Sequence, residues 1–168
     1  MNKRNFMQSV AALAFTASYA PVFALSTVKH SMTGVDSDGK PFNLGDFSGK
    51  FCLVSFFTAG CNLCTIDLKQ MREFYGNNRS KDFVLIGVNI DAKHDDFMEY
   101  ASLIKQAVPT EQRFPLLWRN TPHHTDTFGT IVKQPTHFVL NKKLEQVSKR
   151  EGNFRPEDWD QLWTNFAA

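Results

Sequence analysis

Two continuous apolar runs alternate with two helical patterns through the middle of the chain. Residues 51–57 and 82–90 are almost wholly apolar, as strands buried on both faces should be. Residues 62–79 and 95–108 carry apolar side chains at the spacing of one helix face. In the first of these helices the predicted buried stripe consists of Ile66, Met71 and Phe74 or Tyr75. We therefore predict strand, helix, strand, helix, an order that implies parallel strands with helices packed on the sheet.

The segments on either side of this unit have different patterns. Residues 34–50 are punctuated by Gly and Asp, which predicts a short hairpin or edge element leading in. Residues 135–140 and 144–152 form two strand patterns separated by a spacing suited to a hairpin, and a final helix begins at Pro156. The predicted fold class is a three-layer α/β domain with a mixed central sheet.

The first 24 residues have the pattern of a signal peptide. Lys3 and Arg4 form a short basic region, residues 10–20 are mostly apolar, and small residues at Val22 and Ala24 suit a signal peptidase. An uncleaved membrane anchor is the alternative, but it needs about 20 continuous apolar residues, which this stretch does not supply. We expect export to the periplasm with cleavage near Ala24.

The remaining residues, 25–168, have the length of a single domain, which we expect to be monomeric. Loss of the leader removes two of the 19 basic residues and leaves 17 against 17 acidic ones. A domain with no net charge is poorly suited to bind the phosphate backbone of a nucleic acid, so we expect no nucleic-acid partner. Three cysteines also exclude a disulfide framework.

Two of those cysteines, Cys61 and Cys64, lie where a predicted strand gives way to a predicted helix. A helix N-terminus presents unpaired N–H groups and a positive dipole end, which favour the thiolate needed for disulfide exchange. Cys64 returns to the same face one turn later, within reach of a mixed disulfide on Cys61. A static disulfide, two core thiols, or a metal site completed by His123, His124 or His137 are the alternatives.

Five segments carry a family resemblance. In order and spacing, the chain resembles the TlpA-type thiol-disulfide oxidoreductases of the bacterial periplasm, in the AhpC/TSA-Redoxin branch of the thioredoxin-like superfamily. The segments are DSDGKPFNLGDFSGKFCLVSFFTAGCNLC, GVNID, FPLLW, QPTHFVLN and EGNFRPEDWDQLW. The resemblance covers residues 30–166 and implies a thioredoxin-like fold whose central sheet is flanked by helices, with an N-terminal β extension.

The resemblance also implies roles for individual residues. Cys61 would be the exposed nucleophile, Cys64 the buried resolving thiol, and Pro135 a cis-proline facing the pair. The protein would act on protein disulfides without a cofactor, more as a reductant than as an oxidant. A membrane-embedded thiol reductase would then be its electron donor.

The chain departs from the family pattern around the cysteines. Gly60 stands where a tryptophan is usual, and Asn62 and Leu63 replace the usual residues between the cysteines. Because those residues strongly influence redox potential, the direction of electron flow is open.

Further departures concern proton transfer. Asp67 stands where a glutamate is usual and is either the acid that takes a proton from Cys64 or a solvated first-turn residue. Ser55 replaces the buried aspartate of cytosolic thioredoxins. Cys52 is expected to face the core as a small apolar residue.

Two other functions remain open. A thiol peroxidase would use Thr58 three residues before Cys61, although Val54 stands where peroxiredoxins carry a proline. A periplasmic Cu(I) chaperone would use Cys61, Cys64 and His137, since thiolates suit Cu(I). Strand alternation is expected to turn His137 away from the cysteines.

Overall fold

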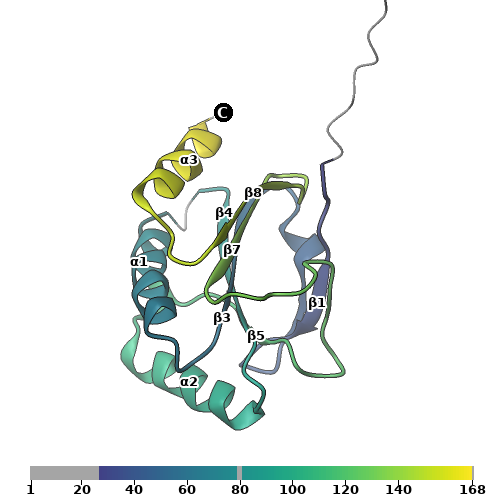
Figure 1. Cartoon of the computed structure of the whole chain (residues 1–168), viewed down its shortest axis with the longest axis vertical. Helices are drawn as coiled ribbons and strands as arrows, with labels where there is room; N and C mark the ends of the chain where they lie inside the picture. The colour runs from purple at the N-terminus through teal and green to yellow at the C-terminus, as the bar shows by residue number, and fades with distance from the viewer. Residues whose placement is uncertain (1–26, 79–80, 168) are drawn as a thin grey trace, which may run out of the picture.

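The computed structural model describes residues 27–78 and 81–167 and has a five-stranded sheet at its centre (Figure 1). The strands lie in the order β5-β4-β3-β7-β8. The first three are parallel, whereas β7 is antiparallel to both β3 and β8. Their bounds are Leu116–Trp118 for β5, Phe83–Asn89 for β4, Phe51–Phe57 for β3, Thr136–Leu140 for β7 and Gln146–Glu151 for β8. The sheet is therefore mixed, as the sequence predicts.

The three α-helices cover one face of this sheet: α1 (Asn62–Asn78), α2 (His94–Ala107) and α3 (Pro156–Ala167). Inward residues of β3, among them Leu53 and Phe57, pack in one apolar cluster with residues of all three helices. Two short 3-10 helices, Leu44–Phe47 and Thr110–Gln112, lie in connecting segments.

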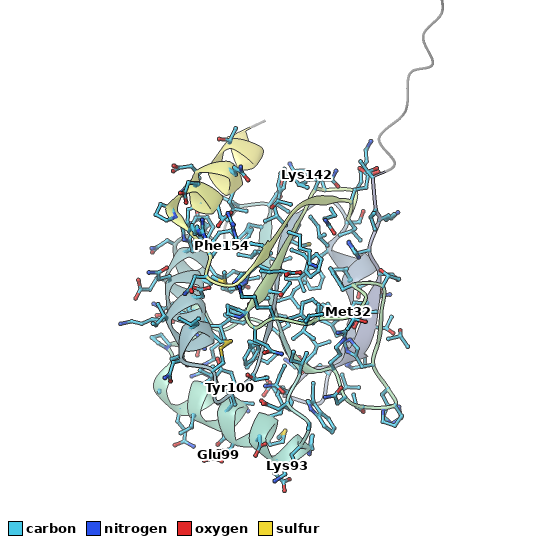
Figure 2. All side chains as sticks on the ribbon, viewed as in Figure 1. Met32, Lys93, Glu99, Tyr100, Lys142 and Phe154 are labelled. Atoms are coloured by element: carbon cyan, nitrogen blue, oxygen red, sulfur yellow. A yellow bond between two sulfur atoms is a disulfide. The ribbon has the colours of Figure 1, made fainter. Side chains whose placement is uncertain are left out.

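A second, three-stranded sheet covers the opposite face. It consists of β1 (Met32–Val35), β2 (Pro41–Asn43) and β6 (Thr125–Asp126) in the order β2-β1-β6. Figure 2 shows Met32 on this side and Phe154 on the helical side of the central sheet, and the two belong to separate apolar clusters. The layers are thus helices, mixed sheet and small β extension, which confirms the predicted fold class.

Several details differ from the sequence prediction. The short strands β5 and β6 were not predicted, because three or two residues are too few to show a period. Ile66, expected on the buried stripe of α1, is exposed, and Asp67 takes an inward position instead. The predicted signal peptide lies outside the described residues. Within the described part of the chain, no helix has the length and apolar character needed to span a bilayer.

Candidate active site

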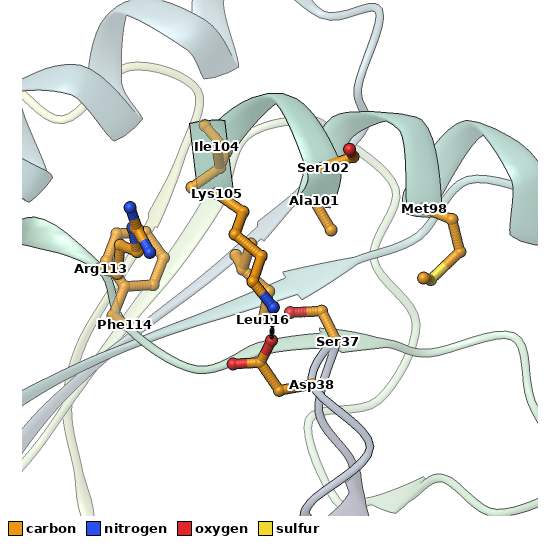
Figure 3. Close-up of a pocket in the computed structure, with 10 residues that line it drawn as sticks. All are labelled: Ser37, Asp38, Met98, Ala101, Ser102, Ile104, Lys105, Arg113, Phe114 and Leu116. Atoms are coloured by element: carbon orange, nitrogen blue, oxygen red, sulfur yellow. Dashed lines mark hydrogen bonds and ion pairs between the residues drawn. The ribbon is translucent and has the colours of Figure 1, made fainter. Parts of the chain in front are cut away.

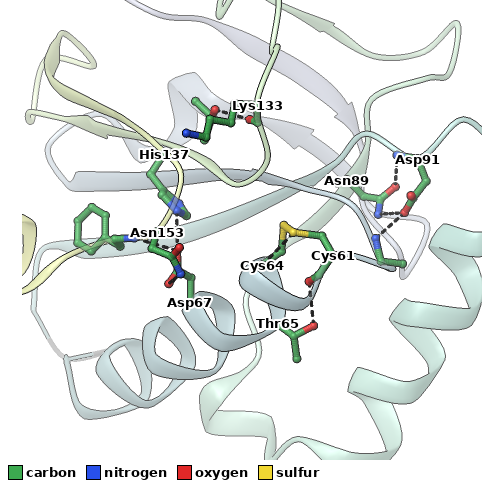
Figure 4. The surroundings of a disulfide bond; sticks show 12 residues. Cys61, Cys64, Thr65, Asp67, Asn89, Asp91, Lys133, His137 and Asn153 are labelled. Carbon is green, nitrogen blue, oxygen red and sulfur yellow. Dashed lines mark hydrogen bonds and ion pairs between the residues drawn. A yellow bond between two sulfur atoms is a disulfide. The ribbon is translucent and has the colours of Figure 1, made fainter.

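The two cysteines form a disulfide at the junction between β3 and α1 (Figure 4). Strand β3 ends at Phe57 and α1 begins at Asn62, so Cys61 lies in the intervening turn and Cys64 in the first helical turn. Their Cα atoms are 5.2 Å apart. Cys61 is half-buried, whereas Cys64 is almost completely buried. The pair thus offers one sulfur to solvent and keeps the other in the core.

The helix N-terminus is directed at the more accessible sulfur. The Cys64 N–H donates a hydrogen bond of 3.0 Å to Cys61 Sγ, and the Thr65 N–H donates to the Cys61 carbonyl at 3.1 Å. The same N–H group can stabilise a thiolate on Cys61 after the disulfide is reduced, together with the positive end of the helix dipole. The geometry suits Cys61 as the attacking sulfur.

A cis peptide bond joins Gln134 to Pro135, as the resemblance implied. The next residue, Thr136, begins β7 and pairs with Phe56, one residue before the end of β3. Pro135 therefore lies at the same end of the sheet as the turn that carries Cys61. Its carbonyl accepts a hydrogen bond of 2.7 Å from the Gly152 N–H.

Asp67 lies one turn along α1 from Cys64, and its side chain is only 2% exposed. The alternative of a solvated first-turn acid is wrong. Oδ2 accepts hydrogen bonds from the Phe154 N–H (2.9 Å) and from His137 Nε2 (3.1 Å), and Oδ1 accepts one from Asn153 Nδ2 (3.3 Å). The carboxylate therefore joins α1 to β7 and to the loop before α3.

His137 faces α1, the helix that begins beside the cysteines, where it contacts Asp67. Strand alternation alone was expected to turn it away from the cysteines. Alternation along β7 fixes only relative directions, and pairing with β3 places His137 opposite Ser55, on the face of Leu53 and Phe57. His124, the other buried histidine considered as a ligand, bonds to Asp126 instead. Within the described residues, no group of three or more His, Cys, Asp or Glu side chains is placed to hold a metal ion.

A second carboxylate, Asp91, fixes the turn before Cys61 and was not identified from the sequence. Its Oδ2 accepts hydrogen bonds from the Ala59 N–H (2.8 Å) and from Asn89 Nδ2 (2.6 Å). Its carbonyl accepts from Trp118 Nε1 and Asn120 Nδ2, both at 2.9 Å. The position of Asp91 directly after an apolar strand was the available signal, because the ends of neighbouring parallel strands meet at one edge of a sheet.

Cys52 is a separate, inert thiol. It is fully buried on β3, in the cluster that faces the small sheet, whereas Cys64 belongs to the cluster under the helices. Burial raises the pKa of the Cys52 thiol to about 12, so it is protonated at neutral pH. The expectation that Cys52 faces the core is confirmed.

One pocket lies beside the turn that carries Cys61, and another lies away from it. A pocket of about 440 Å³ adjoins the turn at Ala59 and Gly60 and is acidic through Asp91, Asp96 and Glu99. A smaller pocket of about 260 Å³ lies between α2 and the β1–β2 turn, where the Asp38–Lys105 ion pair crosses it (Figure 3). Neither cysteine lines the smaller pocket. Of these two pockets, the acidic one borders the turn that carries Cys61.

Known proteins with related sequences include the thiol-disulfide oxidoreductase ResA of Bacillus thuringiensis subsp. konkukian. It is 25% identical over 126 residues, which are 75% of this chain and 69% of the relative. Among solved structures, a thioredoxin-family thiol:disulfide interchange protein of Chlorobium tepidum TLS has a TM-score of 0.67 at 23% identity. The match covers 84% of this chain and 97% of that one.

StoA of Bacillus subtilis has a TM-score of 0.59 at 22% identity and covers 82% and 98% of the two chains. These likenesses show the thioredoxin-like fold. The family model described as the AhpC/TSA family matches residues 17–147, more than half of the sequence. The chain is a member of the AhpC/TSA family.

Proposed function

We propose that this protein is an exported thiol-disulfide oxidoreductase that uses Cys61 and Cys64 to exchange disulfides with other proteins. The observation that carries the proposal is the disulfide at the N-terminus of α1, with Cys61 half-exposed and bonded to a helix N–H and Cys64 buried behind it. The name of the ResA relative, a thiol-disulfide oxidoreductase, supports the same activity.

In the reducing direction, the reaction begins with the dithiol form. The Cys61 thiolate attacks a substrate disulfide, forms a mixed disulfide, and releases the first substrate sulfur as a thiolate, which takes up a proton from solvent. Cys64 then loses its proton and attacks Cys61 Sγ, so the Cys61–Cys64 bond forms and the second substrate thiolate leaves and is protonated. Two electrons pass from the enzyme dithiol to the substrate disulfide.

Asp67 is the proposed acceptor of the Cys64 proton. Residues three apart on a helix have neighbouring side chains, about 5–6 Å apart at Cβ, and both of these side chains are buried against the sheet. A general base must lie within direct or one-water reach of the proton that it takes. The position of Asp67 on the same helix as Cys64, one turn further along, supports this role.

We also propose that the protein works in the periplasm as a reductant, kept reduced by a membrane-embedded thiol reductase. The basic and apolar leader supports export, and the family resemblance supports the direction. Equilibration with glutathione buffers measures the reduction potential. A value near −120 mV, typical of strongly oxidising periplasmic enzymes, would reverse the proposed direction.

Trapping tests the exchange activity directly. The variant Cys64→Ser retains the Cys61 nucleophile but cannot resolve a mixed disulfide, so substrate proteins should stay attached to Cys61 through a bond that dithiothreitol cleaves. Cys52→Ala is the matched control because that thiol is buried on the other face of the sheet. If Cys64→Ser traps no protein and Cys61 resists alkylation at neutral pH, the proposal fails.

The same variants separate the two alternatives. Rapid peroxide consumption that is lost in Cys61→Ser but survives in Cys64→Ser would identify a peroxidase. Stoichiometric Cu(I) binding that is lost in His137→Ala would instead favour a copper carrier. His137 Nε2 is bonded to Asp67 in the disulfide form, so a copper site would require this contact to break.

A further inference from the structure

A polar cluster lies under α1, inside an otherwise apolar layer. The side chains of Asp67 and His137 are 2% and 0% exposed, and their contact joins Oδ2 to Nε2 at 3.1 Å. Figure 4 shows the Asp67 side chain directed from α1 toward His137 on the sheet, with Asn153 beside it. Buried charge is costly unless it is paired and hydrogen-bonded. The donors from Phe154 and Asn153 meet part of that need, and His137 meets the rest.

Ser55 extends the cluster on the other side of the imidazole. It is directly opposite His137 in the β3–β7 register, and opposed residues project to the same face with Cβ atoms about 4.5–5.5 Å apart. Among the described residues, Ser55 Oγ and His137 Nδ1 are buried atoms with no hydrogen-bond partner. Buried polar atoms that lack a protein partner are commonly satisfied by an ordered water. The second ring nitrogen thus has a polar neighbour of its own.

Other titratable groups lie on the elements that adjoin His137. Cys64 lies on α1, one turn before Asp67. Arg150 is opposite His137 on β8 and donates two hydrogen bonds, of 2.8 and 2.7 Å, to Asp158 on α3. Arg150 and Asp158 therefore neutralise each other, whereas the Asp67 carboxylate, one turn after Cys64 on α1, is bonded to His137.

We propose that His137 is a positioning residue for the exchange reaction, which holds Asp67 toward Cys64 and shares with it the proton that Cys64 loses. This inference rests on the function proposed above. With neutral imidazole, Nε2–H donates to Asp67 and the pair carries one negative charge. When Cys64 S–H gives up its proton, the pair becomes neutral, and the negative charge moves to the sulfur that attacks Cys61.

The proton and the electrons balance over the whole step. The Cys64 thiolate forms a bond with Cys61 Sγ, the bond from Cys61 to the substrate sulfur breaks, and the substrate leaves as a thiolate. The pair then returns its proton through solvent to that thiolate. In the opposite direction, the pair supplies the proton that Cys64 takes up when the enzyme disulfide is reduced.

Stopped-flow release of thionitrobenzoate from an aromatic disulfide, 5,5′-dithiobis(2-nitrobenzoate), resolves the two steps. The reduced enzyme releases a first equivalent when Cys61 attacks and a second when Cys64 resolves the mixed disulfide. His137→Gln keeps an amide donor toward Asp67 but cannot take up a proton at these pH values. We expect its second phase to slow about tenfold at pH 7 and to depend on pH differently from that of the wild type, with the first phase unchanged.

Val139→Ala is the control, because it removes volume from the same strand and the same face without touching the cluster. Asp67→Asn is the second variant, since the amide oxygen can still accept from the Phe154 N–H if His137→Gln folds poorly. A double variant, Asp67→Asn with His137→Gln, should be no slower in the second phase than the slower single variant, because the two residues act as one unit.

The outcomes separate the two proposals. A second phase in His137→Gln with the pH profile of the wild type would overturn the role of His137 while leaving disulfide exchange intact. The role of His137 would also be overturned if the double variant slowed the second phase by the product of the two single-variant effects. If the wild-type dithiol releases no thionitrobenzoate in either phase, the exchange function itself fails.

Discussion

Asp67 connects three parts of the chain that are far apart in sequence. Its donors lie 70, 86 and 87 residues away, on β7 and in the loop before α3. A buried donor that loses its acceptor costs about 1–3 kcal/mol, more than the net contribution of the hydrogen bond itself. This one carboxylate therefore contributes to stability and lies one helical turn after Cys64 on α1.

Replacing Asp67 by alanine should reduce the free energy of unfolding by roughly 3 kcal/mol, because three donors lose their partner together. Urea unfolding monitored by tryptophan fluorescence measures the change. Glu73→Ala, an exposed position on the same helix, is the control and should stay within about 0.5 kcal/mol of wild type. Equal losses in the two variants would contradict the role of Asp67 as a buried anchor.

At the scale of elements, the turn between β3 and α1 is held in place by the end of the neighbouring strand. The Asp91 side chain, just beyond β4, accepts from the Ala59 N–H two residues before Cys61. The shape of the turn is thus set by a strand that is not its neighbour in sequence. Loss of the hydrogen bond between Ala59 and Asp91 should therefore alter the turn that carries Cys61 more than it alters the packing of the core.

Asp91→Ala should speed hydrogen exchange at the Ala59 amide by about tenfold or more, since a hydrogen bond to a carboxylate contributes roughly 1.5 kcal/mol or more to keeping that site closed. Disulfide exchange with a protein substrate should slow severalfold while the unfolding midpoint changes little. The control, Asp96→Ala, removes an exposed charge from the same pocket. An equal effect of both variants would indicate bulk charge rather than the hydrogen bond to the turn.

The sequence predicts an element well where its apolar pattern extends over many residues. It does not predict the direction of a side chain where that direction depends on how two strands pair. Strands β3 and β4 are recognisable because seven consecutive residues are nearly all buried. The buried face of α1 includes two polar residues, Asp67 and Arg72, so the apolar pattern alone does not identify that face. For this reason the prediction that Ile66 is buried was wrong. Only the register of β7 with β3 could show which way His137 points.

The candidate site was predictable to a similar degree. Cys61, Cys64 and Pro135 are visible as motifs, and the structure contains the Cys61–Cys64 disulfide and the cis bond before Pro135. Their roles in disulfide exchange stay predictions. Asn153, Phe154 and Asp91 carry no motif, because each acts through a hydrogen bond to a residue brought close only by folding. Such partners follow from tertiary structure and not from local spacing.

At the scale of the whole molecule, an ion cluster links the small sheet to the central one. Asp126 on β6 accepts two hydrogen bonds from Arg119, just after β5, and one from His124. Burial alone would raise the pKa of the Asp126 carboxyl. The hydrogen bonds from His124, Arg119 and the Phe128 N–H outweigh burial and hold that pKa well below its ordinary value.

This depressed pKa predicts how stability depends on pH. The unfolded chain takes up a proton on Asp126 near its ordinary pKa of about 3.9, before the folded protein does, so stability is present above that pH and is lost as pH falls below it. Urea unfolding at pH 7, 4 and 3 should show the gap between wild type and Asp126→Asn narrowing as pH falls. A gap that stays constant would contradict a folded-state pKa below the ordinary value.

The hydrogen bonds of Asp67 also bear on where this domain ends. The match to the AhpC/TSA family stops at residue 147, whereas Asn153 and Phe154 lie beyond that limit. A chain truncated at the family boundary would lose most of β8, all of α3 and two of the three donors to the carboxylate beside Cys64. The C-terminal tail therefore supplies donors to the proposed redox site, and a domain boundary drawn at the end of the family match would separate Cys61 and Cys64 from the segment that holds Asp67 in place.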